Sequence, residues 1–193
     1  KKSVAQFDSA INAEIKNFPA NAYRMYFTAN HDENSWNGTE FEKYGNAYKT
    51  FAVFSQTMYQ SIPLIYNGQE VMNKKRLKFF IKDTIPWNNG FEISGFYKTL
   101  LALRKANPAL AASASYKRLA SSNEAAVFAY LREAGVHKVA ILLNLSKKPQ
   151  KFTIKDAAVN GEPLNVFTGV KEKVNTSHEF SIEPWGYIVY DYQ

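Results

Sequence analysis

The 193-residue sequence has no cysteine, only three histidines and no long apolar run. Without cysteine the chain can form no disulfide, thiol nucleophile or thiolate metal site. No stretch approaches the roughly 18 apolar residues of a transmembrane helix. The opening stretch KKSVAQFDSA carries no apolar segment behind its lysines, so no signal peptide is predicted. It also lacks an initiating methionine, and we expect the chain to be part of a longer protein.

Basic residues outnumber acidic ones by 24 to 17, which gives a net charge of +7. Such an excess can indicate a nucleic-acid or anionic partner. The only dense basic run, however, is Lys74, Lys75, Arg76 and Lys78, and most other lysines alternate with acids as on a solvated surface. We therefore expect neither nucleic acid nor a membrane as a partner. Aromatic residues, at 15%, supply platforms for sugars as well as core volume.

The sequence changes character near residue 111. Before that point, apolar periodicity and breaker residues predict alternating helices and strands. Helices are expected at 4–18, 41–59 and 93–106, and strands at 23–28 and 62–66. The order from the first strand onward is a βαβα unit with parallel strands. Two parallel strands cannot bury both faces, so the unit needs further strands that this chain does not contain.

After residue 111, only short strand patterns and turn residues occur. Strands are expected at 116–119, 126–131, 139–144, 150–154, 164–167, 179–182 and 187–190. This spacing is typical of an antiparallel sandwich. No low-complexity linker separates the two parts, so we expect them to pack closely.

The stretch FTANHDENSW places Asn30, His31 and Asp32 directly after the first predicted strand. Function in parallel α/β units lies in the loops after the strands, and the loop at 30–40 is longer than usual. A carboxylate that accepts from two hydroxyls, beside a donating imidazole, suits a polyhydroxylated ligand, and Trp36 offers a stacking face. The alternative is that the pair caps a strand or helix. No histidine or carboxylate lies at metal-ligand spacing from His31, so no metal site is predicted.

The string FTANHD, followed about 30 residues later by IPLIYNGQE, resembles two signature regions of the α-amylase family of glycoside hydrolases. In that family the first region ends strand seven of a (β/α)8 barrel, the TIM barrel, and the second forms strand eight. The closing PWGYIVY resembles the family's last β domain. The resemblance implies an α/β plus all-β fold. Residues 1–111 would be the C-terminal part of the barrel, and 112–193 an antiparallel β-sandwich domain.

The resemblance also implies roles for matched positions. Asp32 matches the acid that binds and distorts the sugar and stabilises the transition state, and His31 matches the histidine that hydrogen-bonds the same sugar. Asn30 would orient the turn and contribute to the substrate site. Gly68 and Glu70 match a turn in which the glutamate is structural. Candidates for substrate contacts without a fixed role are Trp36, Tyr66 and Arg76.

The family's nucleophile and general acid follow strands four and five, which have no counterpart in this sequence. The resemblance thus implies a fragment of a retaining hydrolase of α-glucans such as starch and maltooligosaccharides, inactive alone. Its partners would be the glucan and the N-terminal barrel portion of the same protein. No cofactor is expected in this chain. The resemblance makes calcium possible in the intact enzyme, because the family often holds it in segments between strands three and four, which are absent here. The absence of cysteine does not fix the compartment, because many secreted bacterial-type enzymes also lack disulfides, so the location stays open, with a periplasmic or secreted one favoured over a cytoplasmic one.

Two other classes stay open. One is a carbohydrate-binding or scaffolding module that works through aromatic residues of the second part: Tyr116, Tyr130, Phe152, Phe167, Trp185 and Tyr187. The other is an amylase-like subunit that has lost catalysis. Within the enzyme class, the sequence does not choose between a hydrolase and a transglycosylase.

Overall fold

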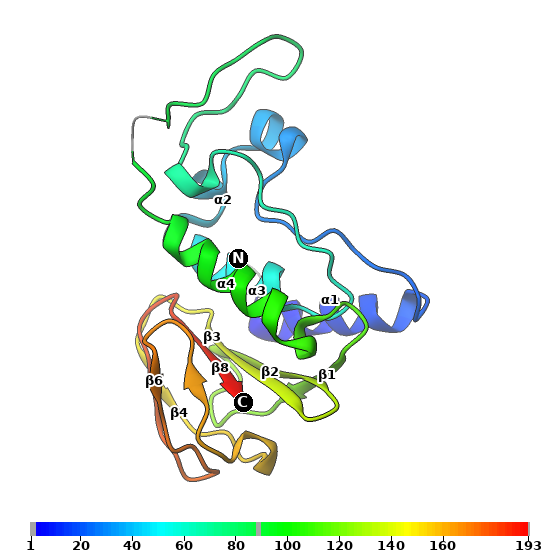
Figure 1. The fold of residues 1–193 in the computed structure, drawn as a ribbon, viewed down its shortest axis with the longest axis vertical. Helices are drawn as coiled ribbons and strands as arrows, with labels where there is room; N and C mark the ends of the chain where they lie inside the picture. Colours follow the sequence, from blue (N-terminus) through cyan, green and yellow to red (C-terminus); the bar gives the residue numbers. More distant parts are fainter. Residues whose placement is uncertain (1–2, 88–89, 193) are drawn as a thin grey trace.

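A computed structural model of the chain describes residues 3–87 and 90–192. Its helices lie on one face of a six-stranded antiparallel sheet, and a small two-stranded sheet covers the other face (Figure 1). The helices are α1 (Val4–Asn17), α2 (Glu40–Tyr44), α3 (Tyr48–Thr57) and α4 (Ser94–Ala106). Within the described ranges, no helix has the length and apolarity to cross a membrane.

Helix α1 begins and ends where the sequence predicted. Ser3 and Gln6 form a capping box, in which each side chain accepts a hydrogen bond from the other residue's backbone N–H. The helix ends just before Pro19, which cannot continue it. Phe7 on its inner face packs edge-on against Phe54 and Phe128, with ring centroids 5.1 Å away in both cases. The apolar stripe of α1 thus joins α3 to the β-sheet.

The helix predicted at 41–59 is interrupted. Gly45 ends α2 with a φ of 53°, a backbone conformation that other residues rarely adopt, and a short 3-10 turn at Gly45–Ala47 leads into α3. The side-chain periodicity continues across the break, with Tyr44 and Phe51 rings 4.9 Å apart. The apolar periodicity at 41–59 therefore predicted the buried face of this segment correctly, but it did not predict the break at Gly45.

The two segments predicted as parallel strands lie side by side as a short parallel ladder. Arg24 N–H donates to Gln60 O at 2.8 Å, Ile62 N–H to Arg24 O at 2.7 Å, and Leu64 N–H to Tyr26 O at 2.9 Å. The Arg24–Ser61 bridge between them is parallel. The predicted direction is confirmed, although the pairing is too short for either segment to count as a full strand.

The second part of the chain is antiparallel throughout. The large sheet has the order β1-β2-β3-β8-β5-β6, and β4 pairs with β7. The strand bounds are Ser115–Leu119 (β1), Val127–Ala134 (β2), His137–Asn144 (β3), Gln150–Phe152 (β4), Leu164–Asn165 (β5), Val170–Lys171 (β6), Phe180–Ile182 (β7) and Tyr187–Tyr192 (β8). The sequence predicted every strand except β6. Residues 127–132 of β2 are all buried because helices cover one face and the small sheet the other.

The two parts share one apolar cluster and a set of polar contacts. Tyr130 OH lies 2.5 Å from Thr57 Oγ1 at the end of α3. Arg132, fully buried in β2, donates from its guanidinium to the carbonyl oxygens of Thr57, Ala111 and Ser115 at 2.6, 2.7 and 2.9 Å. The close packing predicted from the missing linker is therefore present.

Candidate functional site

His31 and Asp32 project into solvent at the end of the first parallel segment. Asn30 Oδ1 accepts from Glu33 N–H at 2.8 Å and begins a helical turn that continues as a π-helix at Glu33–Asn37. Asp32 makes no capping hydrogen bond to that turn. Its Oδ2 lies 3.6 Å from His31 Nε2, and the two side chains are 57% and 68% exposed. The pair does not act as a cap and is free to meet a ligand.

An aromatic cluster continues from this pair. The Phe79 ring stacks on the His31 ring, with centroids 5.7 Å apart and planes 20° apart. The ring centroid of Phe79 lies 5.4 Å from that of Trp36 and 4.7 Å from that of Phe80, and the centroids of Trp36 and Phe80 are 6.2 Å apart. The structure thus brings the predicted residues His31, Asp32 and Trp36 together and adds Phe79. The sequence offered one signal for this residue, the pair of phenylalanines directly after the basic run.

The loop that carries Phe79 is attached to the π-helical turn. Buried Asn34 accepts from Leu77 N–H at 2.7 Å, and Ser35 Oγ donates to Leu77 O at 2.6 Å. Arg76 donates to the Glu42 carboxylate through Nε and Nη2 at 2.9–3.1 Å, which lowers the pKa of Glu42 to about 2. The predicted substrate contact Arg76 is thus engaged with Glu42 in this structure, at the base of the loop.

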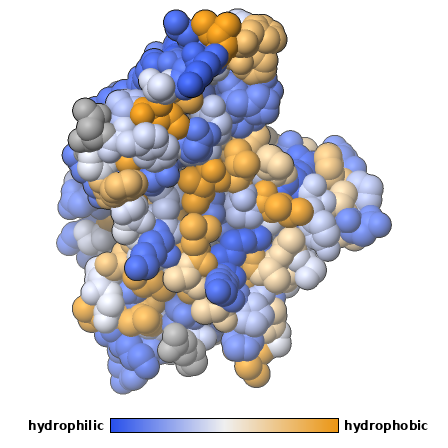
Figure 2. Space-filling model, turned by 45° about the horizontal axis from the view of Figure 1, so that its top comes forward, coloured by the Kyte–Doolittle hydropathy of each residue, from blue (hydrophilic) through white to orange (hydrophobic). Residues whose placement is uncertain are grey.

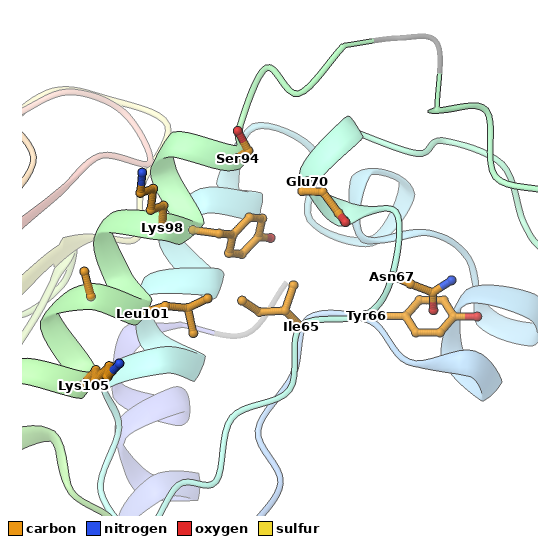
Figure 3. Close-up of a pocket in the computed structure, with 10 residues that line it drawn as sticks. Ile65, Tyr66, Asn67, Glu70, Ser94, Lys98, Leu101 and Lys105 are labelled. Atoms are coloured by element: carbon orange, nitrogen blue, oxygen red, sulfur yellow. The ribbon is translucent and has the colours of Figure 1, made fainter.

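Gly68 and Glu70 form a tight turn after the second parallel segment. Gly68 has a φ of 92°, and a side chain there would come within 3.1 Å of Asn73 and 3.2 Å of Ile85. Glu70 Oε2 accepts from Gly68 N–H at 2.9 Å, so this carboxylate closes the turn. Tyr66 lies before the turn and lines an open groove of about 660 Å³ against α4, with Leu101 on the opposite wall (Figure 3).

Comparison with known proteins shows what the chain is similar to. No protein-family model matches the chain. α-Amylase 2 of Dictyoglomus thermophilum is 26% identical over 179 residues, which are 86% of this chain and 30% of that protein. This chain is similar in sequence to part of an α-amylase. It spans less than a third of that curated relative's length.

Solved structures of α-amylases share the fold of this chain. A noncanonic maltogenic α-amylase from Thermotoga neapolitana has a TM-score of 0.81 at 18% identity, covering 100% of this chain and 46% of that one. An α-amylase from Lactobacillus plantarum has a TM-score of 0.76 at 19% identity, covering 98% and 43%. In each, this chain corresponds to under half of the whole. Among residues 3–87 and 90–192, no group of three or more acidic or histidine side chains could hold a metal ion.

A buried acid at the start of α2 has no signal in the sequence. Glu40, at the start of α2, is 2% exposed. Its Oε2 accepts from Thr28 Oγ1 at 2.7 Å and Gln69 Nε2 at 2.5 Å, while Gln69 also bonds Tyr97 OH at 3.0 Å. Oε1 has no hydrogen-bond partner in the described part of the chain. Glu40 and Gln69 therefore tie together the ends of both parallel segments and α4.

Burial raises the pKa of Glu40 to about 7, against the hydrogen bonds that lower it. Because the unfolded chain releases this proton near its ordinary value of 4.5, the contribution of Glu40 to the free energy of unfolding should fall between pH 4.5 and 7 and level off above. Glutamine has no proton to lose, so the free energy of unfolding of Glu40→Gln, relative to that of the parent, should rise by on the order of 2 kcal/mol from pH 5 to pH 8. Urea denaturation at both pH values measures this gain. A difference between the two proteins that does not change with pH would contradict the assignment.

Proposed function

We propose that this chain is the C-terminal part of an α-amylase-like retaining glycoside hydrolase that acts on α-glucans such as starch and maltooligosaccharides. The exposed Asp32–His31 pair, at the end of a parallel segment and beside Trp36, carries the proposal. The relation to α-amylases supports it, as does the agreement in fold with α-amylase structures.

In the proposed reaction, Asp32 and His31 hold the sugar whose bond is cleaved. The Asp32 carboxylate accepts from adjacent hydroxyls, and its negative charge stabilises the positive charge that develops on the ring in the transition state. His31 donates to the same sugar, and Asn30 fixes the turn that presents both. Hydrolysis with retention further requires a carboxylate nucleophile and a carboxylic acid that protonates the leaving oxygen.

The other aspartates of the chain do not offer a nucleophile at this site. The remaining four aspartates are each engaged by a residue outside it. Asp8 pairs with Arg118, Asp83 with Lys75, Asp156 with Lys117, and Asp191 accepts from Asn107. The proposal therefore places both bond-breaking groups on the upstream part of the same protein.

Exposed apolar surface along the parallel segments supports such an upstream partner. Met25 and Ile62 are 60% and 55% exposed, and Leu101 of α4 is 48% exposed beside the groove. Isolated parallel strands need cover on both faces. We propose that the remaining barrel strands and helices cover these residues, with 23–28 and 62–66 as strands seven and eight.

The alternative of a carbohydrate-binding β domain finds less support. A sugar platform needs exposed rings, yet Tyr130 and Phe152 are at most 2% exposed, and Phe167 and Tyr187 pack against Phe96 of α4. In the described part of the β domain, the large apolar side chains that are exposed are Val136 and Val170. Neither presents a ring.

Starch hydrolysis tests the proposal. The 193-residue chain alone should release no reducing sugar from starch, because it lacks a nucleophile and a general acid. The same chain combined with the upstream polypeptide of its gene should hydrolyse starch with retention at the anomeric carbon. Hydrolysis by the chain alone, or none by the combination, would refute the proposed function.

A further inference from the structure

A protruding loop beside the His31–Asp32 pair exposes several apolar rings. It runs from Lys74 to Trp87 and projects at the end of the molecule away from the β domain (Figure 1). Phe80 is 84% exposed and Phe79 is 36% exposed, while Trp36 opposite them is 58% exposed. Hydrophobic residues stand out among hydrophilic ones at this end of the molecule (Figure 2). Exposed rings that contact one another in this way indicate a binding surface.

We propose that Trp36 and Phe79 form a platform on which an α-glucan stacks while Asp32 and His31 bind its hydroxyls. The inference rests on the proposed function and deepens it, because it assigns to the loop at 74–87 the role of extending the sugar-binding surface beyond the cleaved residue. Phe80 forms the outer edge of this platform.

The geometry joins the platform to the polar pair without a gap. Asp32 contacts His31, His31 stacks on Phe79, and Phe79 lies against Trp36. A glucose ring has an apolar C–H face and a rim of hydroxyl groups. A surface of rings bordered by a carboxylate and an imidazole matches both features.

The platform is held in place before any ligand arrives. Asn34 and Ser35 fix the backbone of Leu77 from the π-helical turn, two residues before Phe79. Asp83 closes the other end of the loop by pairing with Lys75 and accepting from Lys78 N–H at 3.0 Å. A surface that needs no ordering on binding loses less free energy to conformational entropy.

The charges around the platform favour a glucan over a lipid surface. Lys78 and Lys82 flank the paired phenylalanines and would suit an anionic membrane. The Asp32 carboxylate, however, is 57% exposed at the other border of the same cluster, where it would meet lipid phosphates. A neutral, hydroxyl-rich ligand satisfies this carboxylate, whereas a phosphate-rich surface repels it.

Titration of the 193-residue chain with maltoheptaose, followed by tryptophan fluorescence and by calorimetry, tests the platform. We expect saturable binding, and we expect Trp36→Ala and Phe79→Ala each to raise Kd about three- to tenfold. Phe79→Tyr, which keeps a ring, should bind like the parent. Phe91→Ala removes a ring that is about as exposed as that of Trp36 but pairs with Trp87 instead, and should not change Kd. Thermal unfolding of each variant verifies that it folds.

Three results would overturn the platform. The first is no saturable binding of maltoheptaose. The second is binding that Asp32→Ala abolishes and that neither ring substitution weakens. The third is sedimentation with vesicles of phosphatidylcholine and phosphatidylglycerol that Phe80→Ala abolishes, in a chain that binds no maltoheptaose. If the combined polypeptides hydrolyse starch, the proposed function holds in each of these cases and only the platform fails. The starch assay therefore distinguishes a failure of the platform from a failure of the proposed function.

Discussion

Replacing Asp32 with asparagine is expected to lower kcat for starch hydrolysis by the combined polypeptides about a hundred- to a thousandfold. Asparagine keeps the shape of the side chain and can still accept a hydrogen bond from a sugar hydroxyl. It loses the negative charge, which matters most when positive charge develops on the sugar ring. The loss should therefore fall on kcat, with a smaller change in KM.

The fold should tolerate this substitution. Asp32 is exposed and makes no capping bond, so the midpoint of urea denaturation should stay at that of the parent. Asp156→Asn is the matched control, because Asp156 caps a 3-10 turn in the β domain and pairs with Lys117. Its kcat should equal that of the parent. A kcat within threefold of the parent for Asp32→Asn would contradict the role proposed for Asp32.

Those parts of the fold that depend on local chemistry were predictable from the sequence. The apolar periodicity at 4–18 and the following Pro19 predicted α1, and turn residues between short apolar runs predicted the strands of the antiparallel sheet. The parallel direction of 23–28 and 62–66 followed from the helix between them. The strand β6, with only two residues, gives no periodicity and was missed. Gly45 interrupts a helix without interrupting its buried stripe, so the stripe alone could not reveal the break.

The arrangement of the candidate site was predictable where its residues are neighbours in the sequence and not where distant residues meet. Residues of FTANHDENSW lie together because they are adjacent in sequence. The approach of Phe79 to His31 depends on a loop almost 50 residues away, held by contacts from Asn34 and Ser35. Glu40 looks like any acid in a first helical turn, which commonly faces solvent. Its burial follows from the packing of α4 through Tyr97 and was visible only in the structure.

The α/β part and the β domain meet at Arg132, and its substitution should have the largest effect on stability. Arg132 is fully buried in β2, and its guanidinium donates to four backbone carbonyls and pairs with no carboxylate among the residues that the structure describes. Burial lowers its pKa to about 10, so it stays charged at neutral pH. The Thr57 carbonyl it binds is at the C-terminus of α3, where the helix dipole favours a cation.

Arg132→Met should lower the free energy of unfolding by about 3 kcal/mol or more, because methionine fills part of the space but leaves these carbonyls without donors. Arg132→Lys should lose less, since an ammonium keeps the charge but lacks the planar fork that reaches several carbonyls at once. Arg76→Met makes the same change at an exposed arginine and should leave the midpoint of urea denaturation unchanged. If Arg132→Met unfolds at the parent's midpoint, apolar packing around Phe128 and Tyr130 alone holds the two parts together.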